Sequence, residues 1–158
     1  MNLRIDLGDQ TLAVMEGGRE QKRYRVSTAA NGSGEKNNSE CTPRGRHLIR
    51  ARIGAGQPVG TVFAARRPTG EIYAPELRRQ YPHRDWILTR ILWLSGLEPG
   101  RNRFGEVDTM RRYIYIHGTP DEIELGKPGS HGCIRMANSD IIELFDLVPA
   151  GTEVLIHE

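Results

Sequence analysis

The chain has 158 residues, a length that fits a single domain spanning residues 1–158 around one hydrophobic core. Basic and acidic side chains nearly balance, with 22 against 20 and a formal charge of +2. Because nucleic-acid-binding proteins carry a pronounced basic excess, this balance argues against a nucleic-acid partner. No stretch of about 18 uninterrupted apolar residues occurs, so we expect neither a membrane span nor a membrane partner.

The N-terminal third alternates polar and apolar residues. Residues 3–7 and 12–14 flank a glycine-containing turn, which predicts a β-hairpin, and residues 24–26 predict a third strand. Residues 29–46 are rich in turn formers and charges and predict a long loop, a type of segment that is often functional or mobile.

The first predicted strand begins immediately after Met1, and no apolar segment of signal-peptide length precedes it. We therefore expect a cytoplasmic protein. If the N-terminus has been truncated, the expected location is the periplasm.

The middle of the chain predicts further short strands. Residues 47–53 alternate again, and residues 61–64 form a short apolar run. Residues 66–85, with three prolines, predict an elaborated loop. Residues 86–94 are apolar on both faces, as in a central strand that is buried on both sides.

The C-terminal third adds one helix. Residues 111–117 predict a strand with its tyrosines and His117 on one face. Asn138-Ser139 can cap a helix whose apolar face comprises Ile141, Ile142, Phe145 and Val148. A last strand follows at residues 152–157. The predicted fold class is mainly β, a sandwich or barrel of short mixed strands with one helix.

Reactive side chains gather in residues 127–136, Lys-Pro-Gly-Ser-His-Gly-Cys-Ile-Arg-Met, which we call the Cys133 loop. A second imidazole, His117, stands upstream at the end of the predicted strand 111–117. Cysteine with histidine is the minimum for thiol catalysis. The loop's reactive side chains are Ser130, His131, Cys133 and Arg135.

Thiol chemistry requires the proton of Cys133 to be removed. An unperturbed thiol with a pKa near 8.5 is only about 3% ionised at neutral pH, and lowering that pKa to about 7 takes roughly 2 kcal/mol. An imidazolium at hydrogen-bonding distance supplies that energy, so we expect His117 beside the thiol. No Asp or Asn motif accompanies His117, which leaves a backbone carbonyl as the group that orients it.

The surrounding residues suit substrate contacts. Gly132 permits close backbone approach, so that N–H groups around Cys133 can point at an oxyanion. Arg135 can clamp a substrate carboxylate. Ser130 and Thr119 are candidates for hydrogen bonds that hold the two loops together or contact substrate.

Inert roles and metal binding are the alternatives. Buried cysteines commonly pack as small hydrophobic groups. Zinc could use Cys133 with His117 and His131, but a structural site needs a fourth ligand, and the remaining thiol, Cys41, lies in the predicted long loop. We therefore expect no metal and no cofactor. The histidines without a motif, interpreted as surface or packing residues, are His47, His83 and His157.

His-Gly-Thr at residues 117–119, followed by Ser-His-Gly-Cys-Ile-Arg-Met at 130–136, resembles the signature of the YkuD-like L,D-transpeptidase family. Thr-Pro-Arg-Gly at residues 42–45 looks like the family's Thr-Pro-x-Gly turn, and residues 151–154 look like its closing strand. The resemblance covers nearly the whole chain. It implies a mainly β domain that attacks the bond between diaminopimelate and D-alanine in peptidoglycan tetrapeptide stems, through a thioester.

The resemblance also implies roles for individual residues. Cys133 would be the nucleophile, His117 the base, and the Gly118 carbonyl the group that orients the base. The residues carried over for the oxyanion site and the donor stem are His131, Gly132 and Arg135.

The second substrate depends on where the protein works, because an amine resolves the thioester in transpeptidation and water does so in carboxypeptidation. Without an export signal or wall-binding module in the sequence, we expect an L,D-carboxypeptidase that trims soluble tetrapeptides in murein recycling. The alternatives are an L,D-transpeptidase that forms 3-3 crosslinks or exchanges D-amino acids, a non-catalytic binder of wall peptides, and a thiol redox module.

Overall fold

The computed structural model describes the whole chain, residues 1–158, and short strands dominate it. The strands are β1 (Asn2–Asp6), β2 (Thr11–Glu16), β3 (Arg19–Ser27), β4 (Gly45–Ile53), β5 (Thr61–Ala64), β6 (Arg67–Ile72), β7 (Ile87–Gly96), β8 (Tyr115–Gly118), β9 (Ile134–Met136) and β10 (Glu153–His157). The helical elements are α1 (Pro75–Gln80), the 3-10 turn η1 (Gly105–Val107) and α2 (Asn138–Leu147). None of these helices has the length and apolar character needed to cross a bilayer.

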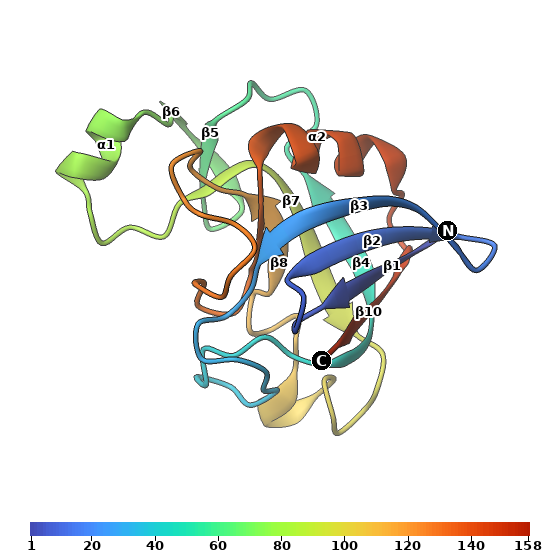
Figure 1. Cartoon of the computed structure of the whole chain (residues 1–158). Helices are drawn as coiled ribbons and strands as arrows, with labels where there is room; N and C mark the ends of the chain where they lie inside the picture. The colour runs from blue at the N-terminus through green and yellow to red at the C-terminus, as the bar shows by residue number, and fades with distance from the viewer.

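Eight strands close into a barrel, in the order β4-β10-β1-β2-β3-β9-β8-β7 (Figure 1). The ring closes because β7 pairs with β4 as well as with β8. The pairs β1–β10 and β8–β9 are parallel and the other pairs are antiparallel, so the sheet is mixed. The hairpin of β5 and β6 extends from β7 outside the ring. The predicted mainly β fold is confirmed.

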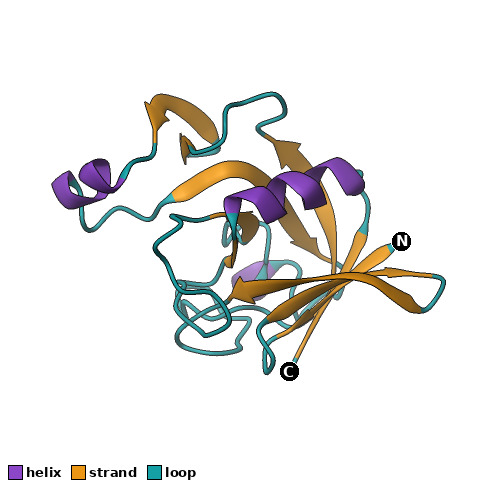
Figure 2. Cartoon of the chain, turned by 45° about the horizontal axis from the view of Figure 1, so that its top comes forward, coloured by secondary structure: helices purple, strands orange, loops and turns teal.

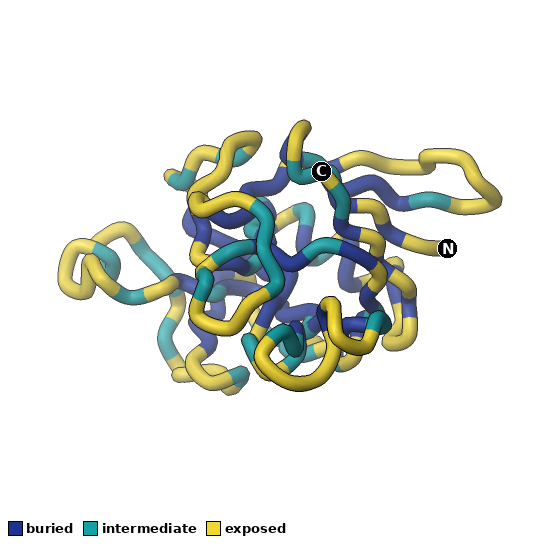
Figure 3. Tube along the Cα trace, turned by 90° about the horizontal axis from the view of Figure 1, so that it is seen from below, coloured by how far each residue is buried: buried dark blue, intermediate teal, exposed yellow.

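The core lies inside the barrel and is completed by α2. Alternate residues of each barrel strand point inward, such as Leu3 and Ile5 of β1, which are fully buried. Helix α2 lies across the strands, whereas α1 stands apart beside the β5–β6 hairpin (Figure 2). Buried backbone runs through the middle of the molecule, and the connecting loops are mostly exposed (Figure 3). Leu144 joins the buried face of α2, and Ile142, predicted there, is only partly buried.

The prediction that Asn138 caps α2 is wrong, because the N-cap residue is Ala137 and no side chain makes a capping hydrogen bond. The buried Asn138 amide instead donates to the Thr119 carbonyl at 3.0 Å and to the Asp121 carboxylate at 3.1 Å. Asn138 therefore joins the start of α2 to the chain that follows β8.

Three segments differ from the sequence-based prediction. The predicted loop 66–85 contains β6 and α1, because β6 is largely exposed and lacks alternation, and α1 is too short to show a helical period. The predicted strand 111–117 starts only at Tyr115, because Tyr113 has a left-handed φ of 57° and sits in a turn. Finally, the Cys133 loop includes strand β9.

His47 in β4 predicts a pH-dependent stability. Its ring is fully buried, with Nδ1 3.0 Å from the Gly45 carbonyl and Nε2 3.0 Å from the Thr109 hydroxyl. Burial lowers the pKa of His47 to about 4. A folded-state pKa below the unfolded value near 6.5 gives stability that is present above pH 6.5 and lost as the pH falls toward 4.

We expect His47 to reduce the free energy of unfolding by up to roughly 3 kcal/mol across this pH range. Urea unfolding of the wild type and of His47→Gln at several pH values measures the effect, since carboxylates titrate equally in both. The variant should show a shallower loss below pH 6.5. Equal pH slopes in the two proteins would contradict the prediction.

Candidate functional site

The pairing of β8 with β9 brings the two parts of the predicted site together. Their parallel register sets His117 opposite Arg135 and Ile116 opposite Ile134. The two isoleucines point into the core, so His117 and Arg135 project from the other face. Cys133, two positions before Arg135, projects from that face as well.

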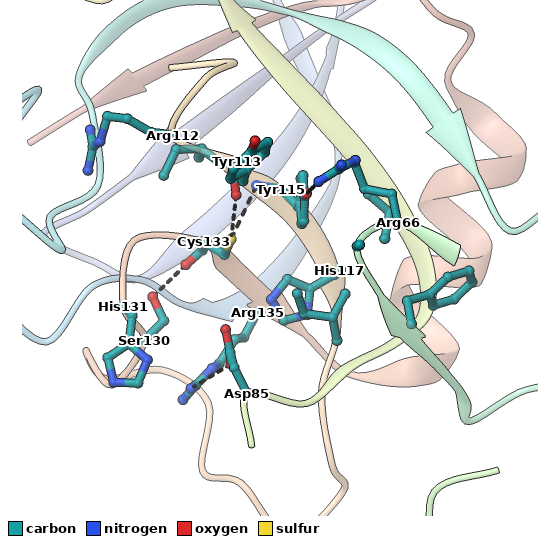
Figure 4. A pocket seen from close by; sticks show the side chains of 15 residues that line it. Arg66, Asp85, Arg112, Tyr113, Tyr115, His117, Ser130, His131, Cys133 and Arg135 are labelled. Carbon is teal, nitrogen blue, oxygen red and sulfur yellow. Dashed lines mark hydrogen bonds and ion pairs between the residues drawn. The ribbon is translucent and has the colours of Figure 1, made fainter. Parts of the chain in front are cut away.

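A cavity of about 500 Å³ opens over this face (Figure 4). The predicted residues that line it are His117, Ser130, His131, Cys133 and Arg135. The cavity is also lined by charged and aromatic residues that the sequence analysis did not single out, among them Arg66, Asp85, Arg112, Tyr113 and Tyr115. Gly118, Thr119 and Gly132 do not line it.

The Cys133 thiol is held by two backbone groups. Sγ accepts a hydrogen bond from the Tyr115 N–H at 3.3 Å and donates to the Tyr113 carbonyl at 3.3 Å (Figure 4). Although the residue as a whole is only partly buried, the burial of its thiol raises the pKa of Cys133 to about 12, and the Asp85 carboxylate acts in the same direction. The expected thiolate with a pKa near 7 is therefore wrong for the free protein, whose thiol is protonated at neutral pH.

His117 is fully buried in β8, and its ring is held by its own neighbour. Nδ1 lies 2.6 Å from the Gly118 carbonyl, an acceptor, which assigns the proton to Nδ1 and leaves the Nε2 lone pair free. Nε2 is buried and has no hydrogen-bond partner. Burial lowers the pKa of His117, so the ring is neutral. The expected direct hydrogen bond to the thiol is absent, because Sγ donates to Tyr113 instead.

Gly118 occupies a position where a side chain does not fit. A Cβ there would lie 2.7 Å from the Leu88 carbonyl and would clash with the Asn138 amide oxygen. The next residue, Thr119, accepts the Asn138 hydrogen bond through its carbonyl, and it borders a neighbouring groove instead of the cavity. Both residues therefore fix the end of β8, from which His117 projects.

A compact turn presents Cys133. The Ser130 hydroxyl donates to the Cys133 carbonyl at 2.6 Å and accepts the Gly132 N–H at 3.2 Å. The Gly132 carbonyl accepts the Thr42 hydroxyl at 2.9 Å. No acceptor in the protein takes the N–H groups of His131 and Cys133, so these two amides are available to a substrate oxygen.

Arg135 and His131 border both the cavity and the neighbouring groove. Arg135 donates to the Gly129 carbonyl at 3.1 Å, and its guanidinium lies 3.8 Å from the Asp85 carboxylate. The His131 ring is exposed at the rim (Figure 4). Asp85 carries no motif and lies at the end of the predicted loop 66–85, so nothing in the sequence distinguished it.

Arg112 is a second residue that the sequence did not reveal. Its half-buried guanidinium donates to the Gly34 carbonyl at 3.2 Å, the Ser39 hydroxyl at 3.3 Å and the Cys41 carbonyl at 2.6 Å. These hydrogen bonds hold the long loop, residues 29–46, next to the cavity. Cys41 itself lies outside the cavity lining, and no group of three or more His, Cys, Asp or Glu side chains is placed to hold a metal ion.

Comparison with solved structures supports the same architecture. An L,D-transpeptidase from Mycobacterium smegmatis superposes with a TM-score of 0.57 at 19% identity, covering 99% of this chain and 58% of the other. An L,D-transpeptidase from Mycobacterium tuberculosis gives a TM-score of 0.60 at 15% identity, covering 99% and 57%. At these identities the likeness shows the shared fold alone.

Sequence relatives match shorter segments. The putative L,D-transpeptidase YkuD of Bacillus subtilis is 49% identical over 47 residues, which are 30% of this chain and 29% of that protein. The putative L,D-transpeptidase YqjB of the same species is 47% identical over 55 residues, covering 35% and 31%. Each match thus spans less than a third of the curated relative.

The family model described as the L,D-transpeptidase catalytic domain, YkuD, matches residues 2–156, which is nearly the whole chain. The match includes residues of every strand of the barrel and the turn that carries Cys133. The chain therefore belongs to the YkuD family of L,D-transpeptidase catalytic domains.

Proposed function

We propose that this protein cleaves the bond between diaminopimelate and D-alanine in a peptidoglycan tetrapeptide, with Cys133 as nucleophile and water as final acceptor. The observation that carries the proposal is the convergence of the Cys133 thiol and a neutral His117 on one cavity. Two backbone N–H groups without acceptors, from His131 and Cys133, lie at the same turn. Together these groups meet the needs of acyl transfer, namely a nucleophile, a base and an oxyanion site.

In the acylation step, the free Nε2 of His117 takes the thiol proton as Sγ attacks the scissile carbonyl carbon. Proton transfer that is concerted with the attack of Sγ suits this site, because burial disfavours formation of a thiolate before the substrate binds. The backbone N–H groups of His131 and Cys133 stabilise the negative charge on the carbonyl oxygen by donating hydrogen bonds to it. The carbon–nitrogen bond then breaks, His117 returns the proton to the departing amine, and D-alanine leaves a thioester behind.

In the second step, water attacks the thioester while His117 takes one of its protons. The carbon–sulfur bond breaks, the sulfur regains the proton from His117, and the tripeptide leaves with a new carboxylate. Each step uses the same nitrogen, first as base and then as acid.

The charge of the cavity supports water as the acceptor. Arg66, Arg112 and Arg135 line it, and Asp85 is its only acidic residue. This positive excess attracts a peptide that carries carboxylates and opposes an acceptor amine, which arrives as an ammonium ion. Neutral water meets no such opposition.

The transpeptidase alternative has support in the neighbouring groove of about 470 Å³. The groove shares Asp85, His131 and Arg135 with the cavity, so it offers an acceptor peptide a route to the thioester. In that case an amine would replace water, giving 3-3 crosslinks or exchange of D-alanine for another D-amino acid.

Mass spectrometry of one digestion separates these functions. The protein is incubated with tetrapeptide in water labelled with oxygen-18, with and without an added D-amino acid. We expect tripeptide with one heavy oxygen in its new carboxylate, free D-alanine, and no exchange product. Predominant exchange would overturn the choice of water, and absence of both reactions would overturn the assignment of this chemistry to the chain.

We further propose that the substrate is a soluble fragment of wall turnover, met in the cytoplasm during murein recycling. A cavity of about 500 Å³ is large enough for a few residues of a peptide. Immunodetection of the native protein after cell fractionation tests the location. A cytoplasmic signal is expected, and a periplasmic or wall-bound signal would contradict it.

A further inference from the structure

Among the three arginines of the cavity wall, Arg66 is the one whose guanidinium has neither an acidic partner nor a hydrogen bond to a backbone carbonyl. Arg135 already faces Asp85 and donates to a backbone carbonyl, and Arg112 donates to three acceptors. Arg66 has no acidic partner, and of its five N–H groups one donates, to the Tyr115 hydroxyl at 3.0 Å. Its remaining donors are therefore free for an anion in the cavity.

Two aromatic rings fix the Arg66 guanidinium in place. Its central carbon lies 4.9 Å from the centre of the Trp93 ring and 4.8 Å from that of Tyr113. Stacking of this kind stabilises the cation and restricts the long side chain. Because the group is already ordered, binding a carboxylate costs it little further conformational entropy.

The backbone at Arg66 points to a specific role for its side chain. Ala65 and Arg66 form the turn between β5 and β6 with φ values of 48° and 65°, a conformation that ordinarily selects Gly or Asn. Tyr113, which stacks on the guanidinium, also has a positive φ of 57°. Strained residues of this kind are common at functional sites, and here all three line the cavity.

Tyr115 connects Arg66 to the thiol. Its N–H donates to Sγ of Cys133, and its hydroxyl accepts from Arg66, so the guanidinium lies one tyrosine side chain from the reacting atom (Figure 4). In the tetrapeptide, the terminal carboxylate lies one residue beyond the scissile carbonyl, a span of about 3.5 Å. Because Arg66 and Cys133 line the same cavity, a peptide whose scissile carbonyl lies at Sγ can extend its terminal carboxylate toward Arg66.

We propose that Arg66 binds the free carboxylate of the terminal D-alanine and so restricts the enzyme to peptides with an uncapped C-terminus. This inference rests on the proposed function. The planar fork of arginine pairs with both oxygens of a carboxylate, whereas a terminal carboxamide offers one acceptor and no charge.

Two peptides test the proposal, the tetrapeptide with a free C-terminus and the same peptide ending in D-alaninamide. We expect the wild type to prefer the acid by about 10-fold to 100-fold in kcat/KM. Arg66→Gln should lose this preference by slowing cleavage of the acid alone, and Arg66→Lys should restore part of it. The control is Arg103→Gln, because Arg103 stacks on Phe104 at 4.7 Å outside the cavity. It should retain the wild-type ratio.

Binding provides a readout that does not depend on turnover. Isothermal titration calorimetry of Cys133→Ala should show preference for the acid, and Cys133→Ala combined with Arg66→Gln should show none. A preference that depends on Arg66, without cleavage by the wild type, would support the carboxylate site and overturn the proposed reaction. Equal handling of acid and amide by the wild type, or equal losses for both in Arg66→Gln, would overturn the role of Arg66.

Discussion

Replacing Cys133 with alanine is expected to abolish release of D-alanine, with a fall in turnover of at least about 10³-fold. The cavity offers no second thiol, and the covalent route requires a sulfur at this position. His117→Gln should lose activity on a similar scale, since it removes the lone pair at Nε2, and nucleophile and base act as one unit. Release of D-alanine, followed by mass spectrometry, measures both losses.

The other free cysteine provides the matched control. Cys41 lies outside the cavity lining and contributes its backbone carbonyl, which alanine retains, to the bond with Arg112. Cys41→Ala should therefore keep wild-type turnover. If Cys133→Ala retained full activity, a covalent mechanism at this residue would be excluded. If the wild type bound the tetrapeptide without cleaving it, the chain would be a binder of wall peptides.

Gly132→Ala is expected to have the second largest effect, because it strains the turn that presents the thiol. Gly132 has a φ of 131°, and an added Cβ would lie 3.1 Å from the Ile114 side chain and 3.2 Å from the Cys41 carbonyl. We expect a loss of about 1–3 kcal/mol in unfolding free energy. Displacement of Cys133 by about 1 Å would lower turnover by roughly 10²-fold.

Gly129→Ala is the control for this prediction within the same loop. A Cβ there would lie 3.4 Å from the Ser27 hydroxyl and 3.7 Å from the Arg135 guanidinium, which are ordinary contacts, and its φ is not in the left-handed region. Urea unfolding and D-alanine release for the two variants give the comparison. Similar values for Gly132→Ala and Gly129→Ala would show that the turn tolerates a side chain.

Sequence periodicity predicted elements that bury one face. β1 and β10 have alternating buried residues and were found where predicted, and β7, buried along most of its length, matched its apolar run. β6 was missed because most of its residues are exposed and no burial pattern is imposed on them. The start of β8 was misplaced because the left-handed conformation of Tyr113 has no signature in an otherwise alternating sequence.

The same distinction holds for the residues of the site: those in a local motif could be predicted from the sequence, and the others could not. His117 and the Cys133 loop could be singled out because they form short motifs whose members adjoin in the chain. Arg66, Asp85 and Arg112 lack a motif and reach the cavity only because the β5–β6 hairpin, the segment before β7 and the turn before β8 meet around it. Such proximity is a consequence of tertiary packing and leaves no local pattern.

The sequence by itself therefore determined the family and the mainly β class, and it singled out Cys133 and His117, because local alternation and a short motif carry that information. Only the tertiary structure decided the ionisation of that pair. The surroundings of Cys133 and His117 come from several elements, and the resulting burial raises one pKa and lowers the other. Desolvation depends on what packs around a group, so the resting state is a neutral thiol near a neutral imidazole.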